Sequence, residues 1–169
     1  MAMASGGPLK DEQPIEQAVV SVLVASPAEL PVMQQTGAIL EKLGLPYETR
    51  VMSSSRSPDE VDEYARTAFE RGIKVLIATT GISGHLAAAV AARTILPVIG
   101  VPISSDQMTG TMALSVTALM PSGVPVATVG IDAAVNAAVL AAQIVALTDP
   151  DVQKQLWKFK DDLAEGLRL

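Results

Sequence analysis

The chain has 169 residues, which is the length of one domain and enough to bury a hydrophobic core. Hydrophobic residues make up 49% of it but aromatic residues only 3%, so the core must consist mainly of Ala, Val, Ile and Leu. The formal net charge is −6 and there is no basic run, which argues against nucleic acid as a partner. Because there is no cysteine, disulfides and thiol nucleophiles are excluded.

The N-terminal stretch "MAMASGGPLKDEQP" lacks the charged start and apolar centre of a signal peptide. We predict a flexible lead-in over residues 1–16 and a single domain over 17–169. The long apolar segment 126–147 contains polar side chains and is rich in Ala, which favours a strand followed by a buried helix over a membrane span. The expectation is a cytoplasmic protein with no membrane partner.

Aliphatic runs alternate with helical patterns along the chain. Strands are predicted at 18–25, 47–52, 74–79, 97–101 and 124–131. Helices are predicted at 30–43, from 58 to about 71, at 81–94, at 109–119, after residue 132, and over the charged C-terminal segment. Strict alternation of this kind predicts an α/β fold in which helices cover both faces of a doubly wound parallel sheet, giving three layers.

Two helix starts carry specific signals. Ser57, Pro58 and Glu60 have the spacing of a capping box with proline at the first helical position. The residues that would form the buried face of this helix are Val61, Tyr64, Ala65 and Ala68. Asp132 is expected to cap the Ala-rich helix that follows it.

Hydroxyls and glycines follow each of the first four predicted strands, in "ASPAELP", "SSSRSP", "TTGISGH" and "PISSDQMTG". In such sheets ligands bind at the carboxyl ends of the strands, and helix N-termini there favour phosphate. This pattern predicts a polar pocket for an oxyanion-bearing ligand, with Ser26 and Ser53 as hydroxyl donors and Arg56 as a bidentate donor. Alternatively, the serines only cap helices and Arg56 only pairs with Glu60.

His85, the single histidine, lies at the exit of the third strand, where a ligand would sit. A lone histidine is often structural, but this position favours a functional role. Glu29 either accepts hydrogen bonds from sugar hydroxyls or adds charge to the first turn of a helix. The sequence has no metal-ligand set and no glycine-rich nucleotide motif, so no metal or cofactor is expected.

From about residue 20 to 147 the chain resembles the PurE family, the N5-carboxyaminoimidazole ribonucleotide mutases and aminoimidazole ribonucleotide carboxylases of purine biosynthesis. The stretches that carry the resemblance are "PVIGVPISS", "MPSGVPVATV" and "NAAVLAAQI", and more weakly "RVMSSSRSPD" and "GHLAAAVAART". The resemblance implies a flavodoxin-like fold, a homo-octamer with shared active sites, and a small phosphorylated substrate and carbon dioxide as partners.

Several residues match the loops of the family, and others depart from them. The resemblance implies catalytic roles at His85 and at Ser55, which stands where the family has a histidine. It implies substrate contacts from Ser26, Glu29, Ser53, Arg56, Thr79, Gly81 and Leu86. Among these, Glu29 replaces an aspartate and Thr79 a glycine; Ile82 and Ala87 also differ from the pattern.

The missing histidine affects the expected chemistry. The mutase reaction implied by the resemblance requires a proton relay, and histidine is the usual group for this work near neutral pH. Because Ser55 cannot relay a proton without a base, the sequence favours a divergent enzyme that removes, adds or moves a carboxylate on a small, possibly phosphorylated heterocycle outside the normal purine step. Decarboxylation with His85 as the proton donor is the simplest version. A genuine mutase and a non-catalytic, oligomeric nucleotide-binding paralogue remain as alternatives.

Overall fold

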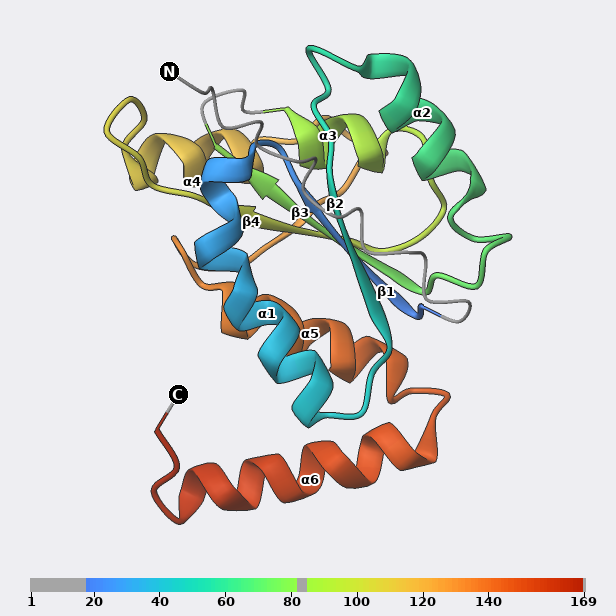
Figure 1. Ribbon diagram of the computed structural model, residues 1–169, viewed down its shortest axis with the longest axis vertical. Coiled ribbons are helices and arrows are strands. Elements are labelled where there is room, and N and C mark those ends of the chain that lie inside the picture. The colour runs from blue at the N-terminus through green and yellow to red at the C-terminus, as the bar shows by residue number, and fades with distance from the viewer. Residues whose placement is uncertain (1–17, 82–84, 169) are drawn as a thin grey trace, which may run out of the picture.

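The computed structural model describes residues 18–81 and 85–168. Five parallel strands form one sheet in the order β2-β1-β3-β4-β5 (Figure 1). The strands are β1 (Val20–Val24), β2 (Tyr47–Val51), β3 (Val75–Thr80), β4 (Val98–Pro102) and β5 (Ala127–Thr128). The order reverses between β1 and β3, and this is the point where open α/β sheets bind ligands.

Helices cover both faces of the sheet (Figure 1). On one face lie α1 (Leu30–Lys42) and α5 (Ala134–Val145), with α6 (Pro150–Ala164) packed against α5. On the other face lie α2 (Pro58–Thr67), α3 (Leu86–Ala91) and α4 (Gly110–Ala118); a short 3-10 helix, η1 (Pro27–Glu29), precedes α1. The predicted three-layer, doubly wound, flavodoxin-like fold with a C-terminal helix is confirmed.

The core is aliphatic, as the composition predicts. Every residue of β1, β3 and β4 is buried, so these strands are covered on both faces. The helix α5 packs closely against α1 because its inner face consists of small side chains. The fully buried residues of that face are Ala134, Ala137, Ala138, Ala141 and Ala142. No helix in the described ranges combines the length and the hydropathy needed to cross a bilayer.

Two predicted elements are much shorter in the structure. The strand expected at 124–131 pairs with β4 only over Ala127–Thr128. Pro125 has no N–H to donate to the sheet, and Asp132 turns the chain with a φ of 53°. The helix expected at 81–94 is α3, only six residues long, and residues 82–84 lie outside the described ranges. The lead-in at 1–16 also lies outside them.

The structure corrects both capping predictions. The helix α2 begins at Pro58 as predicted, but Ser57 makes no side-chain cap bond. Its hydroxyl instead donates to the carbonyl of Ser53 at 3.2 Å. The side chain that a capping box would use therefore stabilises the preceding loop. Asp132 does not cap α5 either, because its carboxylate binds Ser104. The buried face of α2 is confirmed at Val61, Ala65 and Ala68, whereas Tyr64 is only partly buried.

Candidate active site

The loops that leave the first three strands meet at the main chain of Ala25, directly after β1. The Ala25 N–H donates to the hydroxyl of Thr79 on β3 at 3.0 Å and to Oε2 of Glu29 at 3.2 Å. The Ala25 carbonyl accepts a hydrogen bond from Nη2 of Arg56, in the β2 loop, at 3.1 Å. Three of the four exits that the sequence marked as polar are therefore joined by direct contacts.

Glu29 comes from the first loop and lies against the third. Its Oε2 accepts a hydrogen bond from the Thr79 hydroxyl at 2.5 Å. A Cβ added to Gly81 would lie 2.1 Å from the other carboxylate oxygen, Oε1, so the absence of a side chain at Gly81 makes room for Glu29. The carboxylate is held at the switch point between β1 and β3.

The β2 loop forms a cup of hydroxyls. Ser53 is buried, and its hydroxyl accepts from the Arg56 N–H at 3.3 Å and lies 3.2 Å from the hydroxyl of Ser55. Ser55 and Arg56 themselves are exposed. Arg56 donates to the Ala25 carbonyl and makes no ion pair with Glu60. The alternative prediction, that Arg56 only pairs with Glu60, is therefore wrong.

Ser26 performs the capping role that the sequence allowed. Its hydroxyl oxygen accepts a hydrogen bond from the Ala28 N–H at 3.1 Å and caps η1. The hydroxyl hydrogen remains available to an acceptor, so capping and ligand binding do not exclude each other at this position.

His85 and Leu86 begin α3 with opposite environments. The His85 side chain is exposed and does not cap the helix. Leu86 is 1% exposed and packs in the core with Val90 and Ala78, so a ligand could reach it only through its main chain. Thr79 is likewise fully buried, whereas Gly81 lines the exit of β3 through its backbone.

Two features at the strand ends were missed as site candidates. Asp132 joins the β4 exit to the turn before α5, because its carboxylate accepts from the N–H of Ser104 at 2.9 Å and also from the Ser104 hydroxyl. The hydroxyls of "PISSDQ" did mark the β4 exit as polar, but Asp132, the partner of Ser104, is 28 residues away in the sequence. Thr80, the last residue of β3, is 1% exposed and its hydroxyl has no hydrogen-bond partner among the described residues.

Replacing Thr80 with valine is expected to stabilise the protein. Valine has nearly the shape of threonine, and a buried polar group without a partner costs about 1–3 kcal/mol. We therefore expect the free energy of unfolding, measured in urea, to rise by about 1 kcal/mol. Thr80→Ser is the control that keeps the hydroxyl and should give no gain. A less stable Thr80→Val variant would show that the hydroxyl has a partner in the folded protein.

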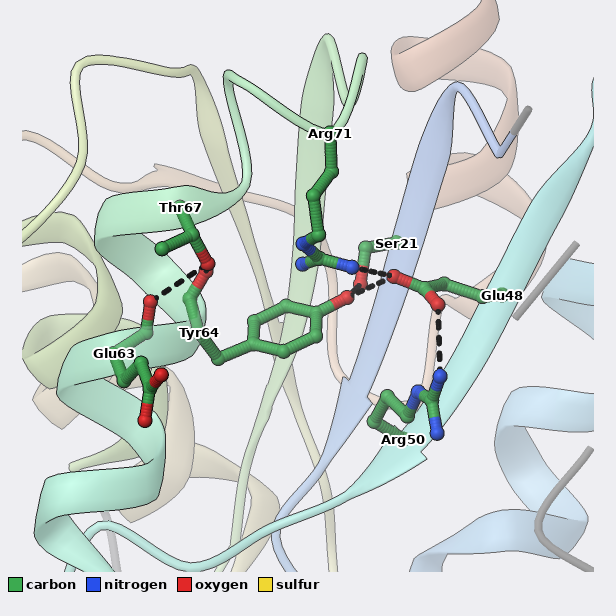
Figure 2. Close-up of polar contacts among 7 residues, drawn as sticks. All are labelled: Ser21, Glu48, Arg50, Glu63, Tyr64, Thr67 and Arg71. Carbon is green, nitrogen blue, oxygen red and sulfur yellow. Dashed lines mark hydrogen bonds and ion pairs between the residues drawn. The ribbon is translucent and has the colours of Figure 1, made fainter. Parts of the chain in front are cut away.

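A second polar cluster lies at the opposite, amino end of the sheet (Figure 2). Glu48 on β2 accepts hydrogen bonds from Tyr64 on α2, from Arg71 at 2.8 Å and from Arg50 at 3.2 Å. The Arg71 guanidinium also lies 4.2 Å from the centre of the Tyr64 ring. Burial raises the pKa of Tyr64, so its hydroxyl is protonated and donates to Glu48. The oxygen of Tyr64 lies 2.5 Å from the Ser21 hydroxyl, which must then be the donor in that pair.

The described residues contain no cluster of three or more groups that could hold a metal ion. A shallow hollow lies between the C-terminal part of α5 and α6 and contains Leu147, Leu156 and Trp157. Because α5 runs antiparallel to the strands, this hollow is at the end of the sheet away from Ala25.

The fold and the joined loops define a class of protein: a flavodoxin-like α/β protein with polar loops that meet at the strand-order switch. The sequence profile of the family described as AIR carboxylase matches residues 19–166. The chain therefore belongs to the AIR carboxylase family, the PurE family that its motifs indicated.

The relatives share most of their length with this chain. It is 45% identical to the N5-carboxyaminoimidazole ribonucleotide mutase of Pyrococcus abyssi over 85% of this chain and 83% of that protein. It is 46% identical to the Bacillus subtilis protein of the same name, over 83% of this chain and 88% of that one. Among solved structures, Treponema denticola PurE matches with a TM-score of 0.77 and 25% identity, over 86% and 91% of the two chains. An enzyme of PurE type that acts on a carboxylate is thus supported.

Proposed function

We propose that this protein is an N5-carboxyaminoimidazole ribonucleotide mutase. The observation that carries the proposal is the 40–46% identity to relatives, most of them named as this mutase, over most of this chain. Our sequence analysis favoured a divergent role outside the purine step and kept this mutase as an alternative. The relatives support the alternative, and none of those compared supports a separate role.

The proposed residue roles come from the family resemblance, and the contacts at Ala25 are consistent with them. Ser26, Ser53 and Arg56 would hold the substrate phosphate, because they are hydroxyl and guanidinium donors on two joined loops. Glu29 would accept hydrogen bonds from the ribose hydroxyls. Gly81 would contribute by leaving room for the Glu29 carboxylate beside the third loop. These roles are assigned by the resemblance, and the contacts among the loops agree with them.

The proposed chemistry needs one mobile proton. The bond between the carbamate carbon and nitrogen breaks and releases carbon dioxide, and the ring carbon then forms a new bond to that carbon. The ring carbon loses its proton, and the nitrogen gains one, so the reaction balances without a cofactor. His85 is the candidate group for this transfer, because its imidazole is exposed at the β3 exit.

A second candidate function rests on Ser55. This residue stands where the resemblance places a histidine, it is exposed, and its hydroxyl contacts only the hydroxyl of Ser53 among the described residues. An enzyme that adds or removes the carboxylate directly needs His85 to take or give a proton at one atom only, whereas the mutase must move a proton from the ring carbon to the nitrogen; the chain has a single imidazole for either task.

The experiment that separates these functions uses the purified protein and two substrates. Conversion of N5-carboxyaminoimidazole ribonucleotide to the carbon-carboxylated product supports the mutase. Carboxylation of aminoimidazole ribonucleotide in the presence of carbon dioxide, without conversion of the carbamate, supports the carboxylase. Binding of either nucleotide in calorimetry with no turnover would contradict both enzymes and favour a non-catalytic binder.

Replacing Gly81 with alanine is expected to raise KM by about 10- to 100-fold, because the new methyl group would displace the Glu29 carboxylate from its position. The collision is with the end of a flexible side chain, so the melting temperature should change little. Gly130→Ala is the matched control, since its added Cβ would meet only Ala133 at 3.5 Å. Steady-state kinetics of both variants test this; an unchanged KM for Gly81→Ala would remove Glu29 from the substrate site.

The assembly and location of the protein remain proposals. A homo-octamer is consistent with apolar side chains on the surface at α4. Met112 on this helix is 58% exposed, and Leu119, the residue that follows the helix, is 81% exposed. Light scattering on the purified chain measures this directly, and a monomeric mass would contradict it. The single domain over 17–169 and the cytoplasmic location are kept as predictions from the sequence.

A further inference from the structure

We propose that Thr79 is a positioning residue that fixes the carboxylate of Glu29 so that its Oε1 atom faces the ligand. Both residues depart from the family pattern, Glu29 in the first loop and Thr79 near the end of β3, and they compensate for each other. The identity of the ligand rests on the proposed function; the pairing of Thr79 with Glu29 does not.

Thr79 is placed to act through Glu29 and not on a ligand. Its side chain is 0% exposed on a strand that is buried throughout. The hydroxyl oxygen accepts from the Ala25 N–H at 3.0 Å, and the hydroxyl hydrogen is directed to Oε2 of Glu29 at 2.5 Å. A threonine hydroxyl has one hydrogen to donate, so this donor is fully used inside the protein.

The two oxygens of Glu29 are in different environments. Oε2 accepts from both Thr79 and the Ala25 N–H. Oε1 has no hydrogen-bond partner among the described residues, and it lies over Gly81, where the third loop leaves the sheet. Glu29 is only partly buried, so Oε1 is the oxygen left to accept a hydrogen bond from a ligand hydroxyl.

The compensation has a physical reason. Glutamate has one more rotatable bond than the aspartate implied by the resemblance, so its carboxylate loses more side-chain entropy when it is fixed. A glycine at position 79 could not donate to it. The threonine supplies a hydrogen bond from a buried strand, and this bond holds one oxygen while the other stays free.

The test is a set of variants at both positions. Thr79→Val removes the donor and keeps the shape; we expect KM to rise about five- to twentyfold, with a smaller fall in kcat. Thr79→Ser keeps the hydroxyl, and its KM should stay within about twofold of the KM of the original protein. Glu29→Ala removes the carboxylate and should raise KM on its own, and adding Thr79→Val to Glu29→Ala should cause little further change, because both variants remove one shared contact.

A matched control and a second readout keep the outcomes separate. Thr117→Val changes another buried threonine, whose hydroxyl donates to the carbonyl of Ala113 on α4, and should leave KM unchanged.

If the protein turns over the carbamate but Thr79→Val leaves KM unchanged, or if the effects of the two variants on KM are independent, the inference is overturned while the proposed function stands. If turnover is absent but aminoimidazole ribonucleotide binds in calorimetry, the proposed function fails and the same series is judged on Kd. If the nucleotide neither reacts nor binds, both are overturned.

Discussion

Glutamine in place of His85 is expected to lower kcat by about 10²- to 10⁴-fold, the usual contribution of a positioned acid or base. Glutamine keeps a polar side chain of similar length but cannot exchange a proton. His85 is the single histidine of the chain, so no other imidazole can substitute for it within one subunit. The measurement is turnover of N5-carboxyaminoimidazole ribonucleotide at saturating concentration.

Binding and stability distinguish a catalytic His85 from a structural one. The side chain is exposed and does not cap α3, so His85→Gln should melt at nearly the same temperature as the original protein. The Kd for aminoimidazole ribonucleotide, measured by calorimetry, should change much less than kcat. If the variant retains full turnover, the proton transfer belongs to another group; if it loses binding and turnover together, His85 contacts the ligand without carrying the proton.

Replacing Glu48 with glutamine is expected to lower the free energy of unfolding by about 2–3 kcal/mol. Glu48 is 6% exposed and is bonded to two arginines and a tyrosine (Figure 2). Breaking a fully buried ion pair costs about 3–5 kcal/mol, but the side chains of Arg50 and Arg71 are 27% and 36% exposed, so water can partly replace the lost partner. Urea unfolding followed by circular dichroism measures this loss.

The same residue gives stability a predictable dependence on pH. Burial by itself would raise the pKa of Glu48, but hydrogen bonds from Tyr64 and Arg71 and the charges of Arg71 and Arg50 outweigh it and lower the pKa below 4.5. A lowered pKa in the folded state means that the carboxylate stabilises the protein above about pH 4.5 and that this contribution is lost as the pH falls through the folded-state value. The difference in stability between the original protein and Glu48→Gln should therefore shrink below pH 4.5.

A carboxylate on the surface of α2 provides the control for Glu48. Glu60 is exposed and makes no ion pair in the described part of the chain, so Glu60→Gln should change stability by less than about 0.5 kcal/mol. A Glu48→Gln variant as stable as the original would show that the cluster does not stabilise the fold. A loss of stability that is equal at pH 4 and pH 7 would show that the contribution does not depend on the ionisation of Glu48.

The amino-acid pattern was enough to predict the architecture and the edge of the sheet at which the polar loops meet. Aliphatic runs such as "AVVSVLVA" and "KVLIAT" can be buried on both faces only in a covered parallel sheet, and the helical stretches between them impose crossover connections. The polar loops follow the strands directly, so parallel strands bring the exits to one edge. The strand at 124–131 and the helix at 81–94 were predicted too long. Apolar composition does not say which residues form the backbone hydrogen bonds of a strand or a helix.

The partners of the polar side chains could be identified only from the assembled fold. Thr79 is 54 residues from Ala25 and 50 from Glu29, and Asp132 is 28 from Ser104. A hydroxyl or carboxylate has several possible partners in its own loop, and local spacing favours them; this is why Ser57 and Asp132 were assigned to caps that they do not form. Which partner is bonded depends on the register of the strands and the packing of the loops, and both form only when the whole sheet has assembled.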